Sequence, residues 1–373
     1  MALSYWRMLC IALIIIFMAG CSKEVQPVQD ITKRENGHQT FMATQTDPSP
    51  QEKWNTLLGD LKNISVITKE GTEIHLDKQE FLEKFHQIPF VEEAKEDQTA
   101  YDYMVLFWSQ TDEPAVFSLT KQGVKWENTF YQGDGAAKFT DYIEVMVAKE
   151  FFKQVNANRI MVMSKDLDQT KQVSDQSTEP LFSMLQQAQY LKGGPRIPYP
   201  LFPYYVLELD MAGKDIIQVE VLSPTLISVG LGNEKMYYQT IDSLYTPLMN
   251  EMPIANYSEL SFNHLFKADD LQIHDYSGEM AHIYRLKLAD MTDLEIQSTI
   301  HQVIRTLKSG ERVGSSKIGS PTYKLLFTVE KEKTLIDVYP DGFIYQGQFY
   351  KKSEVIKEFK EMLKNESVFH KES

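Results

Sequence analysis

An internal repeat constrains the fold more than any other feature of this 373-residue chain. An aromatic pair followed by a helical pattern occurs three times, as Phe130-Tyr131, Tyr237-Tyr238 and Phe349-Tyr350. The three pairs are spaced almost evenly along the chain, and an apolar strand begins at a similar distance before each of them. These strands begin at Tyr103, Tyr205 and Tyr323. The sequence therefore predicts three tandem copies of one unit of about 100 residues.

Each copy has the same predicted succession of elements. A short strand precedes a leading helix, and three strands joined by short connections precede a closing helix. The leading helices are expected over 78–86, 179–191 and 293–309, and the closing helices over 138–152, 240–249 and 353–364. In the third copy a further apolar run, 283–288, predicts a hairpin partner for the first strand.

The ends of the leading helices carry local signals. Thr292 with Glu295 predicts a capping box at the start of the third one, and Asp77 with Glu80 places similar chemistry at the start of the first. Gly193-Gly194 and Gly310 are expected to end the second and third leading helices.

The connections between the strands are too short for parallel crossovers, so each sheet should be an antiparallel meander. Asp341-Gly342 between two alternating apolar runs is a strong hairpin signal. We expect an α+β protein of three tandem β(β)-α-β-β-β-α repeats, with helices on one face of each sheet. Unit 1 is expected at 54–155, unit 2 at 156–255 and unit 3 at 256–373. The alternative is a single intertwined domain, since repeats that share a helix–sheet interface can pack as one body.

The amino-terminal stretch that ends at Cys21 predicts an export signal. The apolar run from Met8 to Gly20 would span only about 20 Å as a helix at ~1.5 Å per residue. The hydrocarbon core of a bilayer is roughly 30 Å thick, so the run is short for a membrane span. Its end, Ala19-Gly20-Cys21, resembles the lipobox of bacterial lipoprotein signals, although Met18 stands where that family most often has leucine. The resemblance implies cleavage between Gly20 and Cys21 and attachment of diacylglycerol to the Cys21 thiol.

Composition excludes several classes of function for the mature chain. Cys10, lost with the signal, and Cys21 are the two cysteines, so the folded part has no disulfide, catalytic thiol or thiolate metal site. Arg7 is the only charged side chain before Cys21, and its removal changes the formal net charge from −14 to −15. This charge disfavours nucleic acid and anionic lipid headgroups, so we expect no nucleic-acid partner.

Residues 22–53 are polar, with no helical or strand period, and predict a disordered tether between the anchor and the repeats. A lipobox, a polar spacer and repeated units of this kind resemble the uncharacterised surface lipoproteins of Bacillus-type bacteria. The resemblance covers about 300 residues and rests on degenerate structural motifs. It implies the fold and a location on the outer face of the cell membrane, and it assigns no functional residues.

Two short motifs match those of known enzymes without the structural context that these motifs need. The run 118–121, Ser-Leu-Thr-Lys, matches the S-x-x-K of penicillin-binding enzymes but straddles the end of a strand and a turn. The run 230–232, Gly-Leu-Gly, lacks the third glycine and the following helix of a dinucleotide loop. We interpret both as chance matches.

Two groups of residues have the types that bind metals. His274 and His282 flank a possible hairpin turn and could meet a metal with Asp275, but turn histidines are the simpler interpretation. A polar loop holds Asp166, Asp168 and Asp175 without the glycine and glutamate of an EF-hand. We therefore expect no metal and no cofactor.

A proline-rich aromatic loop in the second copy is the main candidate for a binding surface. Tyr199, Phe202, Tyr204 and Tyr205 lie in this loop or directly after it. Prolines stiffen such a loop, so it could present its aromatic rings to a partner. The alternative is a loop that its own aromatic side chains pin over the core.

The sequence favours a non-enzymatic, lipid-anchored scaffold on the outer face of the cell membrane, with no catalytic residues. Its expected partners are the membrane, through lipidated Cys21, and an envelope protein or wall polymer. The alternative is a solute- or wall-polymer-binding lipoprotein, with its ligand between units or at the loop 199–205. An enzyme would need Asp, Glu and His side chains gathered from different units.

Overall fold

The structure is a computed structural model that describes residues 48–95, 100–110, 113–196, 199–211, 216–231, 234–255, 257–314, 319–365 and 368–372. The predicted signal peptide, including Gly20 and Cys21, and most of the predicted tether lie outside the described residues. Within the described ranges, no helix combines the length and the apolar content that crossing a bilayer requires.

Unit 1 is a seven-stranded antiparallel sheet with three helices. Its elements are α2 (Pro50–Gly59), β1 (Asn63–Thr68), β2 (Glu73–Leu76), α3 (Lys78–Lys84), β3 (Glu92–Ala94), β4 (Tyr103–Trp108), β5 (Ala115–Thr120), β6 (Gly123–Trp126), β7 (Thr129–Gln132) and α4 (Asp134–Gln154). The strand order is β2-β1-β4-β5-β6-β7-β3.

Unit 2 repeats this arrangement with a second seven-stranded sheet. Its elements are β8 (Arg159–Ser164), β9 (Gln169–Gln172), α5 (Asp175–Gln186), β10 (Gln189–Leu191), β11 (Tyr205–Asp210), β12 (Ile217–Ser223), β13 (Leu226–Leu231), β14 (Glu234–Gln239) and α6 (Tyr245–Glu251). The strand order is β10-β14-β13-β12-β11-β8-β9.

Unit 3 has the same seven strands and one more. Its elements are α7 (Phe262–Leu265), β15 (Ala268–Asp275), β16 (His282–Leu286), α8 (Asp293–Lys308), β17 (Glu311–Val313), β18 (Tyr323–Val329), β19 (Glu332–Tyr339), β20 (Gly342–Tyr345), β21 (Gln348–Lys351), α9 (Val355–Leu363) and β22 (Phe369–Glu372). The strand order is β17-β21-β20-β19-β18-β15-β16-β22.

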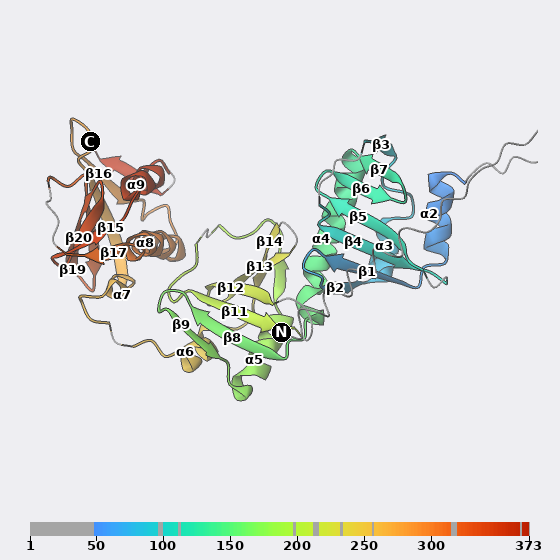
Figure 1. Cartoon of the computed structure of the whole chain (residues 1–373), viewed down its shortest axis with the longest axis horizontal. Helices are drawn as coiled ribbons and strands as arrows, with labels where there is room; N and C mark the ends of the chain where they lie inside the picture. Colours follow the sequence, from blue (N-terminus) through green and yellow to red (C-terminus); the bar gives the residue numbers. More distant parts are fainter. Residues whose placement is uncertain are drawn as a thin grey trace, which may run out of the picture. The chain divides into compact units, whose positions relative to one another are not determined.

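The three sheets have one topology, which confirms the predicted α+β fold built from three repeated units (Figure 1). The tyrosine that begins each central strand occupies the same position in all three sheets. Tyr103 pairs with Leu119 of β5, Tyr205 with Val221 of β12 and Tyr323 with Val338 of β19. All three tyrosines are buried, so the repeated aromatic signal marks core positions.

Each sheet contains strands that the sequence pattern did not reveal. The aromatic pairs themselves form a fourth meander strand, β7, β14 or β21, and a short strand after the leading helix pairs with it. A hairpin partner for the first strand is present in every unit, as β2, β9 and β16, so its prediction in the third copy alone is wrong. These strands are short and mix polar with apolar residues, so pairing with a neighbour, rather than a period, defines them.

Several helix bounds also differ from the prediction. The helix expected over 179–191 is α5, which begins at Asp175 and ends at Gln186. Gln189–Leu191 pairs with β14 instead, because tertiary pairing outweighs helix propensity there. Gly193 and Gly194 therefore do not end a helix. They follow β10 in a turn with φ of 86° and 70°, whereas Gly310 does follow the helix cap Ser309, as predicted.

The first helix within the described residues, α2, was missed because it begins inside the predicted tether. Ser49 and Glu52 form a capping box, and Pro50 occupies the first turn. The helix buries Trp54 completely, and its indole ring lies 5.9 Å from the rings of both Phe107 and Phe117. The aromatic core of unit 1 is organised around this residue.

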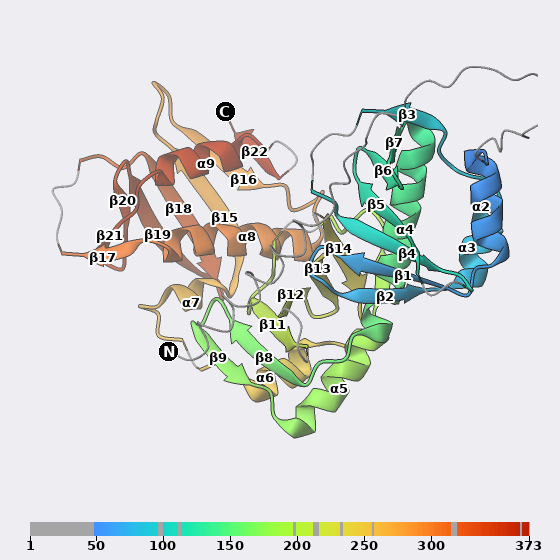
Figure 2. The same ribbon diagram turned by 45° about the vertical axis from the view of Figure 1, so that its right-hand side comes forward.

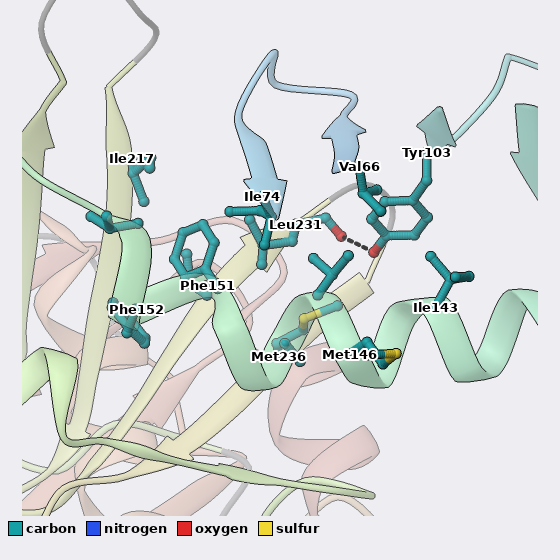
Figure 3. Close-up of a cluster of buried hydrophobic side chains, with 14 of the residues drawn as sticks. Val66, Ile74, Tyr103, Ile143, Met146, Phe151, Phe152, Ile217, Leu231 and Met236 are labelled. Carbon is teal, nitrogen blue, oxygen red and sulfur yellow. Dashed lines mark hydrogen bonds between the residues drawn. The ribbon is translucent and has the colours of Figure 1, made fainter. Parts of the chain in front are cut away.

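Units 1 and 2 share one hydrophobic core, whereas unit 3 has its own. The shared core is built on α4, a 21-residue helix that contributes side chains to both sheets. Figure 3 shows Ile143 and Met146 of α4 near Val66 and Tyr103 of unit 1, with Met236 from β14 of unit 2 close to the same helix. The Tyr103 hydroxyl donates a hydrogen bond to the Leu231 carbonyl oxygen across these sheets at 3.3 Å.

Candidate functional site

The residues of the predicted aromatic loop have different environments in the fold. Tyr205 is completely buried as the first residue of β11. Phe202 stacks on Phe266 of unit 3, with ring centroids 4.3 Å apart and planes inclined by 11°. The guanidinium carbon of Arg305 lies over the Tyr204 ring, 5.5 Å from the ring centroid. The fourth residue, Tyr199, keeps 38% of its surface exposed.

Helix α8 of unit 3 holds the backbone of this loop. The Ser298 hydroxyl donates to the Tyr199 carbonyl oxygen at 3.0 Å, and Arg305 Nη2 donates to the Leu201 carbonyl oxygen at 3.0 Å. The Phe202 amide donates to His301 Nδ1 at 3.0 Å. Ser298, His301 and Arg305 share one helix face because they are three and four residues apart. The loop is thus a structural contact between units 2 and 3, in which the Tyr199 backbone takes part while its side chain stays partly exposed.

The strongest contact between these units is the ion pair of Arg305 with Asp166. Arg305 Nε and Nη2 donate to the two Asp166 carboxylate oxygens, each at 2.9 Å, in a bidentate arrangement. The Asp166 side chain is 3% exposed. Lys308 donates to the backbone carbonyl oxygen of Asp166, and its pKa is lowered chiefly by burial. The sequence suggested Asp166 as a weak candidate for a calcium ligand. In the structure its carboxylate binds the Arg305 side chain, and its backbone carbonyl oxygen accepts a hydrogen bond from Lys308.

His301 is the buried titratable group at this contact. Because Nδ1 accepts the hydrogen bond from the Phe202 amide, Nε2 carries the proton and donates to the Phe266 carbonyl oxygen at 3.1 Å. Burial, the largest cause, lowers the pKa of His301 to about 4. The imidazole is therefore neutral near pH 7, and both of its nitrogens have partners in the structure.

A neighbouring face of α8 lines a groove of about 910 Å³ that reaches to α9. Figure 2 shows α8 and α9 running alongside each other over the third sheet. From α8 come Glu295, Thr299, Gln302 and Thr306, and from α9 and its cap come Glu354, Lys357, Glu358, Glu361 and Met362. Arg196 and Tyr199 of unit 2 lie at its border. The exposed residue of the predicted loop therefore belongs to this groove, which is the candidate functional site.

The groove is acidic. Five carboxylates and two cations line it, which gives a net charge of −3. The pKa of Glu361 is lowered by its hydrogen bond from Lys364, and the pKa of Glu295 is lowered by hydrogen bonds from Thr292 at the start of α8. Both carboxylates therefore stay ionised well below neutral pH.

The other candidate residues lie outside the lining of this groove. β5 ends at Thr120 and Lys121 forms an ion pair with Glu234 of unit 2, so the S-x-x-K match does straddle a strand end. His282 pairs with Asp275 across the β15–β16 hairpin, which places His274 on the other sheet face. Over the part of the chain that the structure describes, no group of three or more metal-ligand residue types gathers.

A smaller recess of about 210 Å³ lies beside α4 and is also acidic. Burial raises the pKa of Glu144 there, and the carboxylates of Glu234 and Asp141 add to this effect. The Tyr103 hydroxyl lies 3.4 Å from Glu144 Oε1. A carboxyl group with a raised pKa can transfer protons, but the recess is small and Lys121 partly neutralises it.

No family model matches this chain, and neither the curated proteins nor the solved structures contain a match. The function must therefore be argued from the fold and the groove. Sequence reasoning found Tyr199 but missed the groove, because its two helical walls are separated in the chain by the five strands β17 to β21. The one local signal was a row of polar residues at three- and four-residue spacing on α8.

Proposed function

We propose that the protein is a lipid-anchored, non-enzymatic interaction scaffold on the outer face of the cell membrane. Cys21 provides the anchor, and three α+β units carried on the tether provide the binding surface. The proposal agrees with the lipobox pattern and with the resemblance to surface lipoproteins of Bacillus-type bacteria. The observation that supports it most is the open groove between α8 and α9, because a groove with helical walls suits a macromolecular partner.

A second candidate function is the binding of a solute or wall polymer. The position of Tyr199 and Arg196 at the groove favours it, since an exposed ring beside polar groups can hold a sugar or peptide. The net charge of −3 at the groove and −15 for the mature chain disfavours anionic polymers. A ligand of this class would therefore be neutral or cationic.

The anchor is tested by the variant Cys21→Ala. Without the thiol no acyl chains can be attached, so we expect this variant to move from the membrane fraction to the soluble fraction while its folded units stay intact. Fractionation followed by immunoblotting measures the distribution, and circular dichroism checks the fold. If the variant stays in the membrane although its signal is shown to be cleaved, the lipid-anchor proposal is wrong.

The scaffold is tested by crosslinking in cells. We expect a reproducible envelope protein to be captured with the wild-type protein and to be lost or reduced with Cys21→Ala, because the partner would meet the scaffold at the membrane. A hydrolase activity of the purified protein that a single substitution abolishes would contradict the non-enzymatic assignment.

A further inference from the structure

We propose that the groove between α8 and α9 binds a basic, amphipathic helix of a partner protein. This inference rests on the proposed scaffold function and names the chemistry of its partner. Three features of the groove carry it: its length between two helices, its apolar floor and its acidic rim.

The dimensions of the groove fit a helix. Its lining residues run from Glu295 to Thr306 on α8 and from Glu354 to Asn365 along α9 and its end. Each run covers about 16 Å at ~1.5 Å per residue, which is the length of a helix of roughly three turns. The volume of about 910 Å³ lies at the upper end of the range of about 300–1,000 Å³ for ligand sites. A helix of this length is about 10–12 Å wide with its side chains, so one face of a third helix would lie in the groove and the other would face solvent.

The floor of the groove is apolar and adaptable. Met291, Met362 and Phe369 line it together with Tyr199 from unit 2. Methionine side chains are flexible and fit themselves to different apolar surfaces. A partner helix would therefore bury its apolar stripe on this floor, as amphipathic helices do in hydrophobic grooves.

The rim of the groove is acidic and would attract positively charged side chains of a partner. Glu358 pairs with Lys352 at 3.0 Å, and Glu361 pairs with Lys364 at 2.7 Å. The pair of Glu361 with Lys364 is exposed on both sides and contributes little stability, so Glu361 can exchange its partner, whereas Lys352 in the other pair is largely buried. Lysine or arginine side chains on the polar face of a bound helix would then face a surface of net charge −3.

The groove is a property of unit 3 rather than of the fold. In unit 1 the corresponding helices are closed by aromatic contacts, with Phe85 of the α3 end 5.0 Å from the ring of Tyr142 on α4. In unit 2 Ser174 and Ser177 at the start of α5 donate to Glu251 of α6 at 2.5 and 2.6 Å. In unit 3 the corresponding helices, α8 and α9, instead face each other across the groove.

The test measures binding of a synthetic helix to the full chain with Cys21→Ala, which needs no detergent. The probe is a fluorescein-labelled leucine–lysine amphipathic peptide of about 14 residues, roughly four helical turns. The control probe carries glutamate in place of lysine in the same pattern. Fluorescence anisotropy should show binding of the lysine peptide that weakens with added salt, and no binding of the glutamate peptide.

Two variants locate the binding site. The double variant Glu358→Gln/Glu361→Gln should weaken binding of the lysine peptide about tenfold, and Gln302→Trp should block it by filling the groove. The matched control Glu279→Gln/Glu332→Gln removes two exposed carboxylates of unit 3 outside the groove and should change the affinity less than about twofold. Circular dichroism of each variant checks that it is folded.

Three outcomes would overturn the proposal: no binding of the lysine peptide, equal losses in the groove and control variants, or displacement of the peptide by neutral chitin-type oligosaccharides. The last would assign the groove to a sugar polymer. In cells, capture of the same partner by wild type and by Glu358→Gln/Glu361→Gln would contradict the groove proposal alone. Absence of any partner for the wild type would contradict the scaffold itself.

Discussion

At the scale of single residues, Arg305 and His301 turn a surface of α8 into a contact between two units. Arg305 binds the Asp166 carboxylate and the Leu201 backbone, and its guanidinium group also lies 5.6 Å from the centre of the Phe266 ring. His301 bonds to the backbone on both of its nitrogens. Because these bonds reach from unit 3 to the loop that contains Tyr199, they also position one border of the groove.

Breaking the ion pair should be costly. We expect Asp166→Ala and Arg305→Ala each to lower the free energy of unfolding by about 3–5 kcal/mol, since each leaves a buried charge without its partner. The double variant should cost less than the sum of the two. Urea denaturation measures these values. The matched control is Arg159→Ala, which removes an exposed pair with Asp210 and should cost less than about 1 kcal/mol.

The buried imidazole predicts a pH dependence. The pKa of His301 is about 4 when folded and about 6.5 when unfolded. A lowered pKa means that the unfolded state binds the proton first, so stability is full above pH 6.5 and is lost as the pH falls toward 4. We expect a loss of about 3 kcal/mol over that interval. In His301→Gln the slope between about pH 6.5 and pH 4.5 should disappear, and an unchanged slope would contradict this assignment.

At the scale of elements, the hairpin partner of the first strand, which is β2, β9 or β16, has its outer edge protected in a different way in each unit. In unit 1 the Gln154 side chain bonds to the backbone N–H and C=O of His75 on β2, at 2.7 and 2.6 Å. In unit 3 the edge strand β16 pairs with β22, which has no counterpart in the other sheets as described. In unit 2 the edge strand β9 is four residues long and carries Lys171, which forms an ion pair with Glu251. Short strands, lysines and covering groups all protect an edge from pairing with other chains.

The predicted caps of α3 and α8 are present in the structure, and the cap of α8 gives a test at the scale of elements. Thr292 and Glu295 form the capping box of α8 that the sequence predicted. Thr292→Ala should lower the stability of unit 3 by about 1 kcal/mol. Thr306→Ala, in the same helix but away from the cap, should be neutral or slightly stabilising because alanine favours the helix interior. Thermal unfolding followed by circular dichroism compares the two variants.

At the scale of the whole molecule, two separate cores imply two cooperative blocks. The core built on α4 unites units 1 and 2, and the second core belongs to unit 3. We expect calorimetry of the Cys21→Ala chain to show two unfolding transitions. Trp54→Ala should shift one of them and Phe359→Ala the other, each by about 3–5 kcal/mol of unfolding free energy.

This prediction has a clear contrary result. If both variants shift every transition together, the described residues unfold as one cooperative block and the ion pair of Arg305 with Asp166 couples the two cores. If Trp54→Ala separates units 1 and 2 into distinct transitions, α4 does not unite them energetically.

The sequence by itself determined the repeat and the fold class. A repeat of about 100 residues and an alternation of apolar residues are patterns of the sequence itself, so they can be recognised without knowing what the chain packs against. The pattern placed Tyr103, Tyr205 and Tyr323 at the start of equivalent strands, and the structure shows that all three are buried. The helix caps at Asp77 and Thr292 were found for the same reason, because a cap depends on residues within one turn.

Only the tertiary structure decided the extra strands, the shared core and the groove. A three-residue strand such as β10 exists because β14 lies beside it. The aromatic loop could have been a binding surface or a packed loop, and contacts with unit 3 engage Phe202 and Tyr204 while leaving Tyr199 exposed. The groove joins residues from Arg196 to Phe369. Its chemistry depends on distances in space between residues far apart in the chain, and no local sequence pattern carries that information.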